Sequence, residues 1–291
     1  MAKVVVMTDT VSCIPRDVAE KNRITIVPAA LIHYDGKEYV EGVTISASDA
    51  YQFIKKDPDR FVTSALTPAY LLSEYEKVAS GAQNILFVTL SSALSAASKT
   101  ASLAADMLKE KFPKTAIRIL DSKTVGGAQG LIVMAAARAA SQGMSLDEVA
   151  SFAEKARQQT HGLMMLDTLR YVYRTGRMSK MGSRIASMFN IKPVNRVTEE
   201  GTVEMVDRTR NRDDGLEILI NLIKDSSKTD ALHFMVNHAN DIELAHQFTA
   251  LLKKNFNCLS ITVSDYSPVM GYGTGPGAIF VGFQPEINLP K

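Results

Sequence analysis

Few cysteines and no long apolar run set the first limits on this protein. Its two cysteines, Cys13 and Cys258, lie far apart and have no neighbouring histidine or cysteine at the spacing of metal ligands. We therefore expect two free thiols in a reducing cytoplasm rather than a disulfide framework. The longest apolar run, from Leu131 to Ala137, is far too short to span a bilayer. No signal peptide is recognisable at the N-terminus, so we expect a cytoplasmic protein.

Motifs for catalysis and for cofactors are also missing. The chain has no G-x-S-x-G nucleophile elbow, no G-x-G-x-x-G or P-loop motif, and no metal-ligand spacing of His, Cys or carboxylates. The histidines are scattered, although His233 and His238 flank a predicted strand and could meet a serine in space. The net charge of +2 is too small to indicate a nucleic-acid partner. These absences favour a binding protein, with no catalytic residue, metal or cofactor, over an enzyme.

The composition and the order of the predicted elements suit an α/β protein of two domains. A chain of 291 residues exceeds the usual ~100–200 residues of one domain. In the first half, short apolar runs alternate with helical patterns, which predicts a parallel sheet with right-handed crossovers. The second half mixes predicted hairpins with helices. We expect an N-terminal, Rossmann-like parallel-sheet domain over residues 1–160 and a C-terminal mixed-sheet α/β domain over residues 161–291.

One stretch has the pattern of a strand, a hydroxyl-rich loop and a helix. Residues 85–90 form a short, mostly apolar, β-prone run, typical of a strand buried on both faces. Ser91–Ser95 follows at once, and the alanine-rich segment after it has helical spacing. Ligands of open α/β sheets bind where strands end and helices begin, and the first amides of a helix attract anions. Ser95 is therefore a candidate to hold a carboxylate or phosphate; alternatively, it only caps the helix.

A second hydroxyl-rich loop is predicted from Phe61 to Pro68. Thr67 and Pro68 mark the start of a helix, as its N-cap and its first residue. Thr63 and Ser64 precede that start, so helix capping does not explain them well. This pair is therefore a second candidate for binding an anion.

Glycines recur at every second position near the C-terminus. They are Gly271, Gly273, Gly275 and Gly277. In an extended segment all four would lie on one face. That face would be bare backbone, open to close approach by a ligand or by the other domain. A flexible turn is the alternative.

Asp9 and one group of glycines each allow both a functional and a structural interpretation. Asp9, at the end of the first predicted strand, either orients a ligand or neighbouring hydroxyls, or serves as a turn and cap residue. Gly126, Gly127 and Gly130 resemble a phosphate loop only loosely. For these glycines we favour close packing of the helix that they begin.

A local excess of positive charge lies in the second half. From Arg170 to Arg212 the chain has ten Lys or Arg and four Asp or Glu, an excess of six against two for the whole chain. The stretch begins on a helix predicted over Thr168–Thr175, with Gly176 as its C-cap. It is either a solvated face or a docking site for an anionic ligand or an acidic partner.

Five segments together resemble the DegV family of bacterial fatty-acid-binding proteins. The family motifs are T-D-S, T-S-x-P-S, S-S-x-L-S-G-T, L-x-Y-L-x-x-G-G-R-I-S and H-x-G-P-G. The matching segments, in the same order, are Thr8–Thr10, Thr63–Pro68, Ser91–Ser95, Leu169–Ser179 and Gly275–Gly277. They run from the first strand to the last, so the resemblance covers essentially the whole chain.

The resemblance implies a carrier that buries a fatty acid between or beneath two α/β domains. The carboxylate would be held by hydroxyls matching Thr63 and Ser95, with Ser64 close by, and we include Ala96, Gly273 and Thr274 in this predicted site. In the bacterial fatty acid kinase system, such a carrier is not catalytic. It presents its fatty acid to a separate kinase subunit, which makes the acyl phosphate used for phospholipid synthesis.

The same resemblance gives the basic stretch a possible partner, the kinase subunit. The candidate docking residues are Arg170, Arg174, Arg177, Arg208 and Arg210. The fatty acid is the only expected ligand. We expect no membrane span, and any contact with a membrane to be transient.

Three departures from the family pattern bear on head-group binding. Ala96-Ala97 stands where the family has Gly-Thr, which removes one hydroxyl. Gly273 stands at the family's His, and Leu66 replaces a proline. Two enzymatic alternatives stay open beside the carrier: a phosphotransfer or kinase-like enzyme on a related α/β fold, and a serine hydrolase that uses Ser95.

Overall fold

The N-terminal sheet has four parallel strands. A computed structural model describes residues 4–172, 175 and 191–289. The order of the sheet is β2-β1-β6-β7. Its strands are β1 (Val4–Asp9), β2 (Ile24–Val27), β6 (Asn84–Thr89) and β7 (Ala116–Asp121). The central strands β1 and β6 are almost wholly buried, which explains their continuous apolar sequence.

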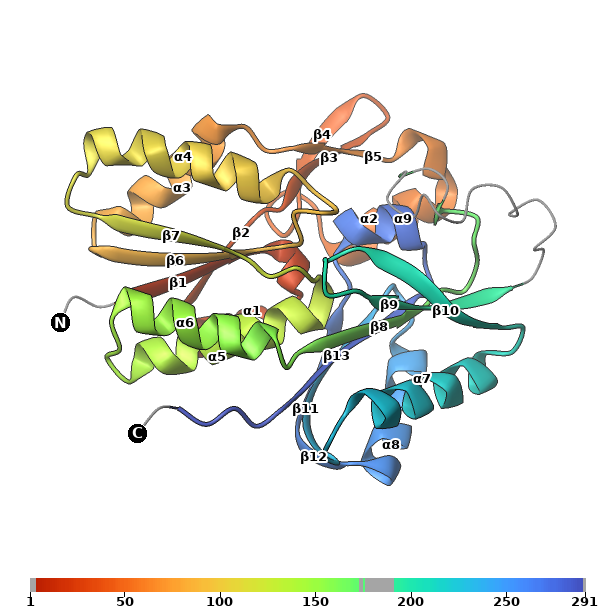
Figure 1. Cartoon of the computed structure of the whole chain (residues 1–291). Helices are drawn as coiled ribbons and strands as arrows, with labels where there is room; N and C mark the ends of the chain where they lie inside the picture. Colours follow the sequence, from red (N-terminus) through yellow and green to blue (C-terminus); the bar gives the residue numbers. More distant parts are fainter. Residues whose placement is uncertain (1–3, 173–174, 176–190, 290–291) are drawn as a thin grey trace.

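Helices cover both faces of this sheet, as Figure 1 shows. On one face lie α3 (Pro68–Ala79) and α4 (Ala97–Lys111). On the other lie α1 (Arg16–Lys21), α5 (Gly126–Ser141) and α6 (Leu146–Arg157). Thr67 caps α3 as predicted. The parallel sheet predicted for the first half of the chain is therefore confirmed.

A small antiparallel sheet of order β4-β3-β5 lies beside the N-terminal sheet (Figure 1). Its strands are β3 (Ala30–Tyr34), β4 (Lys37–Val40) and β5 (Val62–Ala65). Between β4 and β5 the chain forms α2 (Ala47–Lys56) and a short 3-10 turn (Pro58–Arg60). Another 3-10 turn, Thr10–Ser12, follows β1. The loop predicted around Thr63 and Ser64 is thus wrong: both lie on an edge strand, because β3 offers a pairing partner about thirty residues away.

The C-terminal sheet is mixed, as predicted, with the order β10-β9-β8-β13-β11-β12. Its strands are β8 (His161–Met165), β9 (Lys192–Val197), β10 (Val203–Thr209), β11 (Ala231–His238), β12 (Asn257–Asp265) and β13 (Ile279–Pro285). The helices α7 (Arg212–Ser226) and α8 (Ile242–Asn255) cover one face. The division predicted after residue 160 stays a prediction: β8 is the first strand of this sheet, but α5 packs on both sheets.

The helix α5 joins the two larger sheets. It packs against β1 of the N-terminal sheet and against β11 and β13 of the C-terminal sheet, so it is buried nearly all round and apolar on every side. A Cβ at Gly127 would lie 2.5 Å from Met235 Cβ, and one at Gly130 would lie 2.6 Å from the Ser12 carbonyl oxygen. Close packing is therefore the reason for these glycines.

Two predicted elements differ from the structure. The helix predicted over Thr168–Thr175 is not α-helical in its described part, since residues 169–171 form a bend and a turn and residue 172 is in a 3-10 conformation. The glycine segment is not extended either: Pro268–Thr274 forms the short helix α9, and Gly275 (φ 76°) and Gly277 (φ 81°) follow it in left-handed conformations. A helix start at Pro268 and glycines after the last turn are local signals that the alternating pattern obscured. Within the described residues, no helix is long and apolar enough to cross a bilayer.

Candidate functional site

One cavity of about 210 Å³ brings together all the residues predicted to bind a carboxylate. These residues are Thr63, Ser64, Ser95, Ala96, Gly273 and Thr274. They come from three elements: the edge strand β5, the loop after β6, and the helix α9 (Figure 1). The remaining wall is mostly apolar and includes Leu90, Leu94, Met164, Val269, Met270 and Tyr272. Among the described lining residues none is charged.

The position of this cavity follows from the order of the N-terminal sheet. The chain runs from β1 outward to β2 on one side, and later from β6 outward to β7 on the other. The carboxyl ends of β1 and β6 therefore lie at a topological switch point, where open α/β sheets bind ligands. The loop from Leu90 to Ala96 leaves β6 at that point.

The hydroxyls of Thr63 and Ser64 lie on opposite faces of the β3–β5 pair. Thr63 pairs with the fully buried Ile32, whereas Ser64 pairs with Leu31, and side chains of successive strand residues alternate between faces. Thr63 is half-buried, and its hydroxyl makes no hydrogen bond to any described residue. Ser64 is exposed, and its Oγ lies 2.7 Å from His33 Nε2. Thr63 therefore offers an unused hydroxyl to the inner part of the cavity, and Ser64 stands at its rim.

Ser95 stands at the start of α4. Its Oγ accepts a hydrogen bond from the Ala97 amide at 3.2 Å, so the capping interpretation is partly right. The N-cap position itself is Ala96, which has no capping side chain. The Ser95 hydroxyl hydrogen and the Ala96 amide have no acceptor among the described residues. The start of α4 therefore directs two unused donors at the cavity, where the helix dipole also favours an anion.

The α9 residues shape the cavity more than they supply donors. Thr274 is buried, and its hydroxyl donates to the Met270 carbonyl oxygen at 3.3 Å. A Cβ at Gly273 would lie 2.7 Å from Thr175 Cγ2, so the absent side chain allows Thr175 to approach and to line the cavity.

Asp9 fixes the backbone at Leu90, where the loop after β6 begins. Its carboxylate accepts hydrogen bonds from the Leu90 amide at 2.8 Å, the Val11 amide at 3.1 Å and Gln129 Nε2 at 3.1 Å. Burial raises the pKa of Asp9 to about 6, against the opposing effect of these bonds. Asp9 caps the 3-10 turn Thr10–Ser12, so its predicted role as a cap residue is confirmed. Gln129 is the only polar side chain of α5 before Arg138, and it is the sequence signal of this network.

A second buried carboxylate, Glu41, fixes the start of α9. Its Oε2 accepts hydrogen bonds from Thr10 Oγ1 at 2.6 Å and from Ser267 Oγ at 3.0 Å. Burial raises the pKa of Glu41 to about 7. Ser267 is the residue before α9, so Glu41 links the N-terminal sheet to the helix that lines the cavity. No sequence pattern pointed to Glu41.

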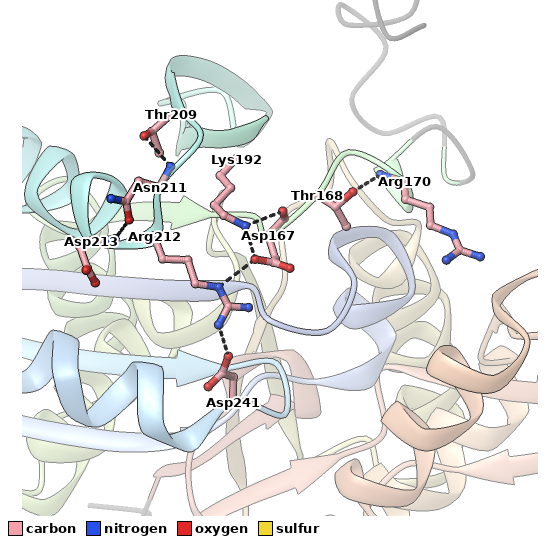
Figure 2. Close-up of polar contacts among 9 residues, drawn as sticks. All are labelled: Asp167, Thr168, Arg170, Lys192, Thr209, Asn211, Arg212, Asp213 and Asp241. Atoms are coloured by element: carbon pink, nitrogen blue, oxygen red, sulfur yellow. Dashed lines mark hydrogen bonds and ion pairs between the residues drawn. The ribbon is translucent and has the colours of Figure 1, made fainter. Parts of the chain in front are cut away.

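Two cations of the basic stretch, Lys192 and Arg212, form ion pairs within the protein. Figure 2 shows Lys192 and Arg212 converging on Asp167, with Arg212 also reaching Asp241. The Arg212 distances are 2.9 Å to each carboxylate. Burial by itself raises the pKa of Asp167, but hydrogen bonds from Arg212 and Lys192 outweigh it and hold that pKa below its ordinary value. These two cations therefore serve the fold.

The other predicted docking residues divide into two groups. Arg170, Arg208 and Arg210 are exposed and make no ion pair with described residues, and Figure 2 shows Arg170 pointing away from the Asp167 network. Arg174 and Arg177 lie outside the described residues. The exposed arginines are thus available for an external partner.

A larger cavity, of about 660 Å³, lies between α1, α5 and the C-terminal sheet. Several of its polar groups pair with one another: Glu286 pairs with both Arg138 and His233, and His233 Nδ1 lies 2.8 Å from Ser260 Oγ. The predicted meeting of His233 with a serine is therefore real. Ser260 lies on the edge strand β12, not on a strand-to-helix turn like the nucleophile of a hydrolase. No group of metal-binding side chains occurs in the described part of the chain.

Comparisons with known proteins agree on one family. The model of a family described as "Uncharacterised protein, DegV family" matches residues 3–286. A DegV domain-containing protein of Caldanaerobacter subterraneus is 27% identical over 285 residues, which cover 98% of this chain and 99% of that protein.

Solved structures show the same fold. A DegV family protein from Thermus thermophilus, described by its fatty-acid binding, has a TM-score of 0.87 at 21% identity, covering 98% of this chain and 100% of its own. The fatty acid kinase B3 protein of Streptococcus pneumoniae, loaded with linoleic acid, has a TM-score of 0.84 at 20% identity with the same coverage.

Proposed function

The chain belongs to the DegV family, and on that premise we propose that it binds a long-chain fatty acid in the 210 Å³ cavity. The carboxylate is held by the hydroxyls of Thr63 and Ser95 and by the Ala96 amide, with Ser64 at the rim. We further propose that the protein is a non-catalytic carrier, which presents the fatty acid to a separate kinase subunit for acyl-phosphate formation.

The observation that carries the proposal is the convergence of unused donors in a cavity with apolar walls. Thr63, Ser95 and Ala96 each have a hydrogen-bond donor without an acceptor among the described residues. A carboxylate buried without partners would cancel much of the gain from burying its acyl chain. Three neutral donors can offset that cost, since hydrogen bonds to a charged acceptor contribute about 1.5–3 kcal/mol each.

The apolar wall supports an acyl ligand. Each buried methylene contributes about 0.8 kcal/mol. The cavity of about 210 Å³ is smaller than the ~300–1,000 Å³ of typical ligand sites. A long chain therefore has to displace side chains, and Met164 and Met270 in the wall are flexible enough to move.

The exposed arginines support a kinase partner. Arg170, Arg208 and Arg210 make no ion pair with described residues, so a complementary acidic surface can pair with them. We include Arg174 and Arg177 in the same proposed docking surface. Such charges act mainly on the rate of association.

Native mass spectrometry of the purified protein tests the ligand. We expect a co-purified fatty acid, and after delipidation we expect the protein to bind palmitic or oleic acid again. A delipidated, folded protein with no affinity for either acid would contradict the carrier proposal. ATP turnover by the isolated chain would favour the phosphotransfer alternative, and covalent labelling of Ser95 by a serine-directed phosphonate would favour the hydrolase. For the hydrolase, no described histidine contacts Ser95.

A further inference from the structure

The imidazole of His33 contacts one candidate hydroxyl from outside the cavity. Its Nε2 lies 2.7 Å from Ser64 Oγ. Leu31 pairs with Ser64 and His33 pairs with Val62, so His33 and Ser64 are diagonal neighbours on one face of the β3–β5 pair. Ser64 lines the cavity and His33 does not. His33 therefore acts on the cavity only through Ser64.

The proton on His33 Nε2 decides what Ser64 offers to a ligand. A serine hydroxyl has one hydrogen to donate and two lone pairs to accept with. If Nε2 carries no proton, Ser64 donates to it and presents only lone pairs to the cavity. If Nε2 carries a proton, the ring donates to Ser64 Oγ, and the hydroxyl hydrogen is available to a ligand. Only the second arrangement suits an anion.

Glu38 of β4 lies opposite His33, but no hydrogen bond or ion pair joins the two side chains, so both arrangements of the ring are open. Its Nδ1 makes no hydrogen bond to any described residue, so the chain does not fix the tautomer. His233 provides the contrast, because its Nε2 lies 2.7 Å from Glu286 Oε2 and its Nδ1 lies 2.8 Å from Ser260 Oγ. There the Glu286 carboxylate can only accept, so His233 Nε2 carries a proton and donates it. The His33 ring, unlike that of His233, can respond to a ligand.

We propose that His33 is a positioning residue for head-group recognition: it donates to Ser64 and so leaves the Ser64 hydrogen to an anionic oxygen of the ligand. The inference rests on the proposed function and adds how the site distinguishes a fatty acid from an uncharged lipid of the same length. A fatty alcohol can donate to Ser64 as well as accept from it, so its binding does not depend on the His33 tautomer.

The first test follows the ring itself in the delipidated full-length protein. Nitrogen-15 NMR distinguishes a protonated from an unprotonated ring nitrogen, and His33→Gln assigns the His33 signals. We expect oleic acid to shift the His33 signals to those of a protonated Nε2. Oleyl alcohol, or oleic acid added to Ser64→Ala, should not produce that shift. Identical His33 signals with and without oleic acid would overturn the proposal.

The second test compares affinities for the acid and the alcohol. We expect His33→Leu to weaken oleic acid binding roughly three- to tenfold, the effect of about one hydrogen bond, and to leave oleyl alcohol almost unaffected. His33→Gln, which keeps an N–H donor, should retain most of the preference for the acid. Adding His33→Leu to Ser64→Ala should cause little further loss, because the two residues act as one unit.

The matched control is His233→Leu, which removes the same kind of histidine–serine contact at the larger cavity and should change neither affinity. Equal losses for acid and alcohol in His33→Leu would assign His33 a structural role and overturn the proposal. If wild-type protein binds oleic acid while His33→Leu is unaffected, only the role of His33 fails. If wild-type protein binds neither oleic nor palmitic acid, the proposed function fails with it.

Discussion

The hydroxyl groups that line the candidate site differ in whether their hydrogen already has an acceptor. Thr63 and Ser95 keep theirs free of described acceptors, whereas Thr274 donates its hydrogen to the Met270 carbonyl oxygen. Residues of the same type in one cavity therefore differ in what they can offer an anion. The difference comes from their backbone surroundings: Thr274 lies in a helix, where a hydroxyl reaches the carbonyl four residues back.

Removing one free hydroxyl should weaken fatty-acid binding. We expect Ser95→Ala to cost about 1–3 kcal/mol of binding free energy, because the buried carboxylate loses a donor that no other residue replaces. Isothermal titration calorimetry with oleic acid measures the change. Ser102→Ala is the matched control: Ser102 lies exposed on the same helix, and its hydroxyl donates to the Ser98 carbonyl oxygen. Unchanged affinity in Ser95→Ala would leave Ser95 as a helix cap only.

The buried Glu41 should make stability depend on pH. Its pKa is about 7 in the folded protein against an ordinary value of 4.5. Between these values the unfolded chain releases a proton that the folded protein retains, so stability falls as pH rises through this window. Glu41→Gln removes that loss. We expect the free energy of unfolding of the variant, relative to wild type, to rise by about 2–3 kcal/mol between pH ~4.5 and pH ~8.

Urea unfolding at a series of pH values measures this difference. Asp106→Asn is the control, because Asp106 is an exposed carboxylate on α4 and should show almost no such trend. A difference between Glu41→Gln and wild type that stays constant with pH would contradict the prediction.

At the scale of the element, the short helix α9 depends on a close approach to α2. A Cβ at Gly271 would lie 2.6 Å from the Tyr51 ring and hydroxyl, and Tyr51 is fully buried with its hydroxyl donating to the Tyr266 carbonyl oxygen at 2.9 Å. Tyr51 cannot yield without losing that bond. The first glycine of the alternating pattern is therefore a packing requirement.

A methyl group at this contact should disturb both stability and the cavity. We expect Gly271→Ala to lower the free energy of unfolding by about 1–3 kcal/mol, because the site is overpacked. Fatty-acid affinity should fall as well, since α9 moves against the cavity. Chemical denaturation and titration calorimetry measure the two effects. Gly81→Ala is the control, because a Cβ there meets nothing within 4 Å. Equal free energies of unfolding for Gly271→Ala and Gly81→Ala would contradict the prediction, because α9 would then be able to move away from α2 without cost.

At the scale of the whole molecule, some cations of the basic stretch form internal ion pairs and others are exposed at the surface. Asp167 and Asp241 neutralise Lys192 and Arg212. The charge left for a partner is therefore smaller than the sequence count suggested, and among the described residues it lies on Arg170, Arg208 and Arg210.

Reversing part of this exposed charge should affect a partner and not the ligand. We expect Arg208→Glu with Arg210→Glu to slow association with the proposed kinase subunit at least tenfold at low ionic strength. Fatty-acid affinity should stay unchanged. Surface plasmon resonance and titration calorimetry measure the two quantities. Lys155→Glu, an exposed reversal on α6, is the control. Equal association rates for the reversed variant and wild type would discard this part of the docking surface.

Local interactions explain what the sequence determined. The buried strand β6 and the Thr67–Pro68 start of α3 were both predicted correctly. Each depends on residues a few positions apart, so its signal is present in the sequence. The hydroxyl-rich segments at Thr63–Ser64 and at Ser95 are also visible in the sequence, because each can be identified without knowing the other.

Only the tertiary structure decided what these residues do. β5 became a strand because β3 pairs with it, and Glu41 became a structural carboxylate because Ser267, 226 residues away, reaches it. Whether a hydroxyl keeps a free hydrogen likewise depends on which groups the fold packs around it. Residue types and short-range patterns lie in the sequence, but hydrogen-bond partners, burial and the shared cavity arise only when distant segments meet.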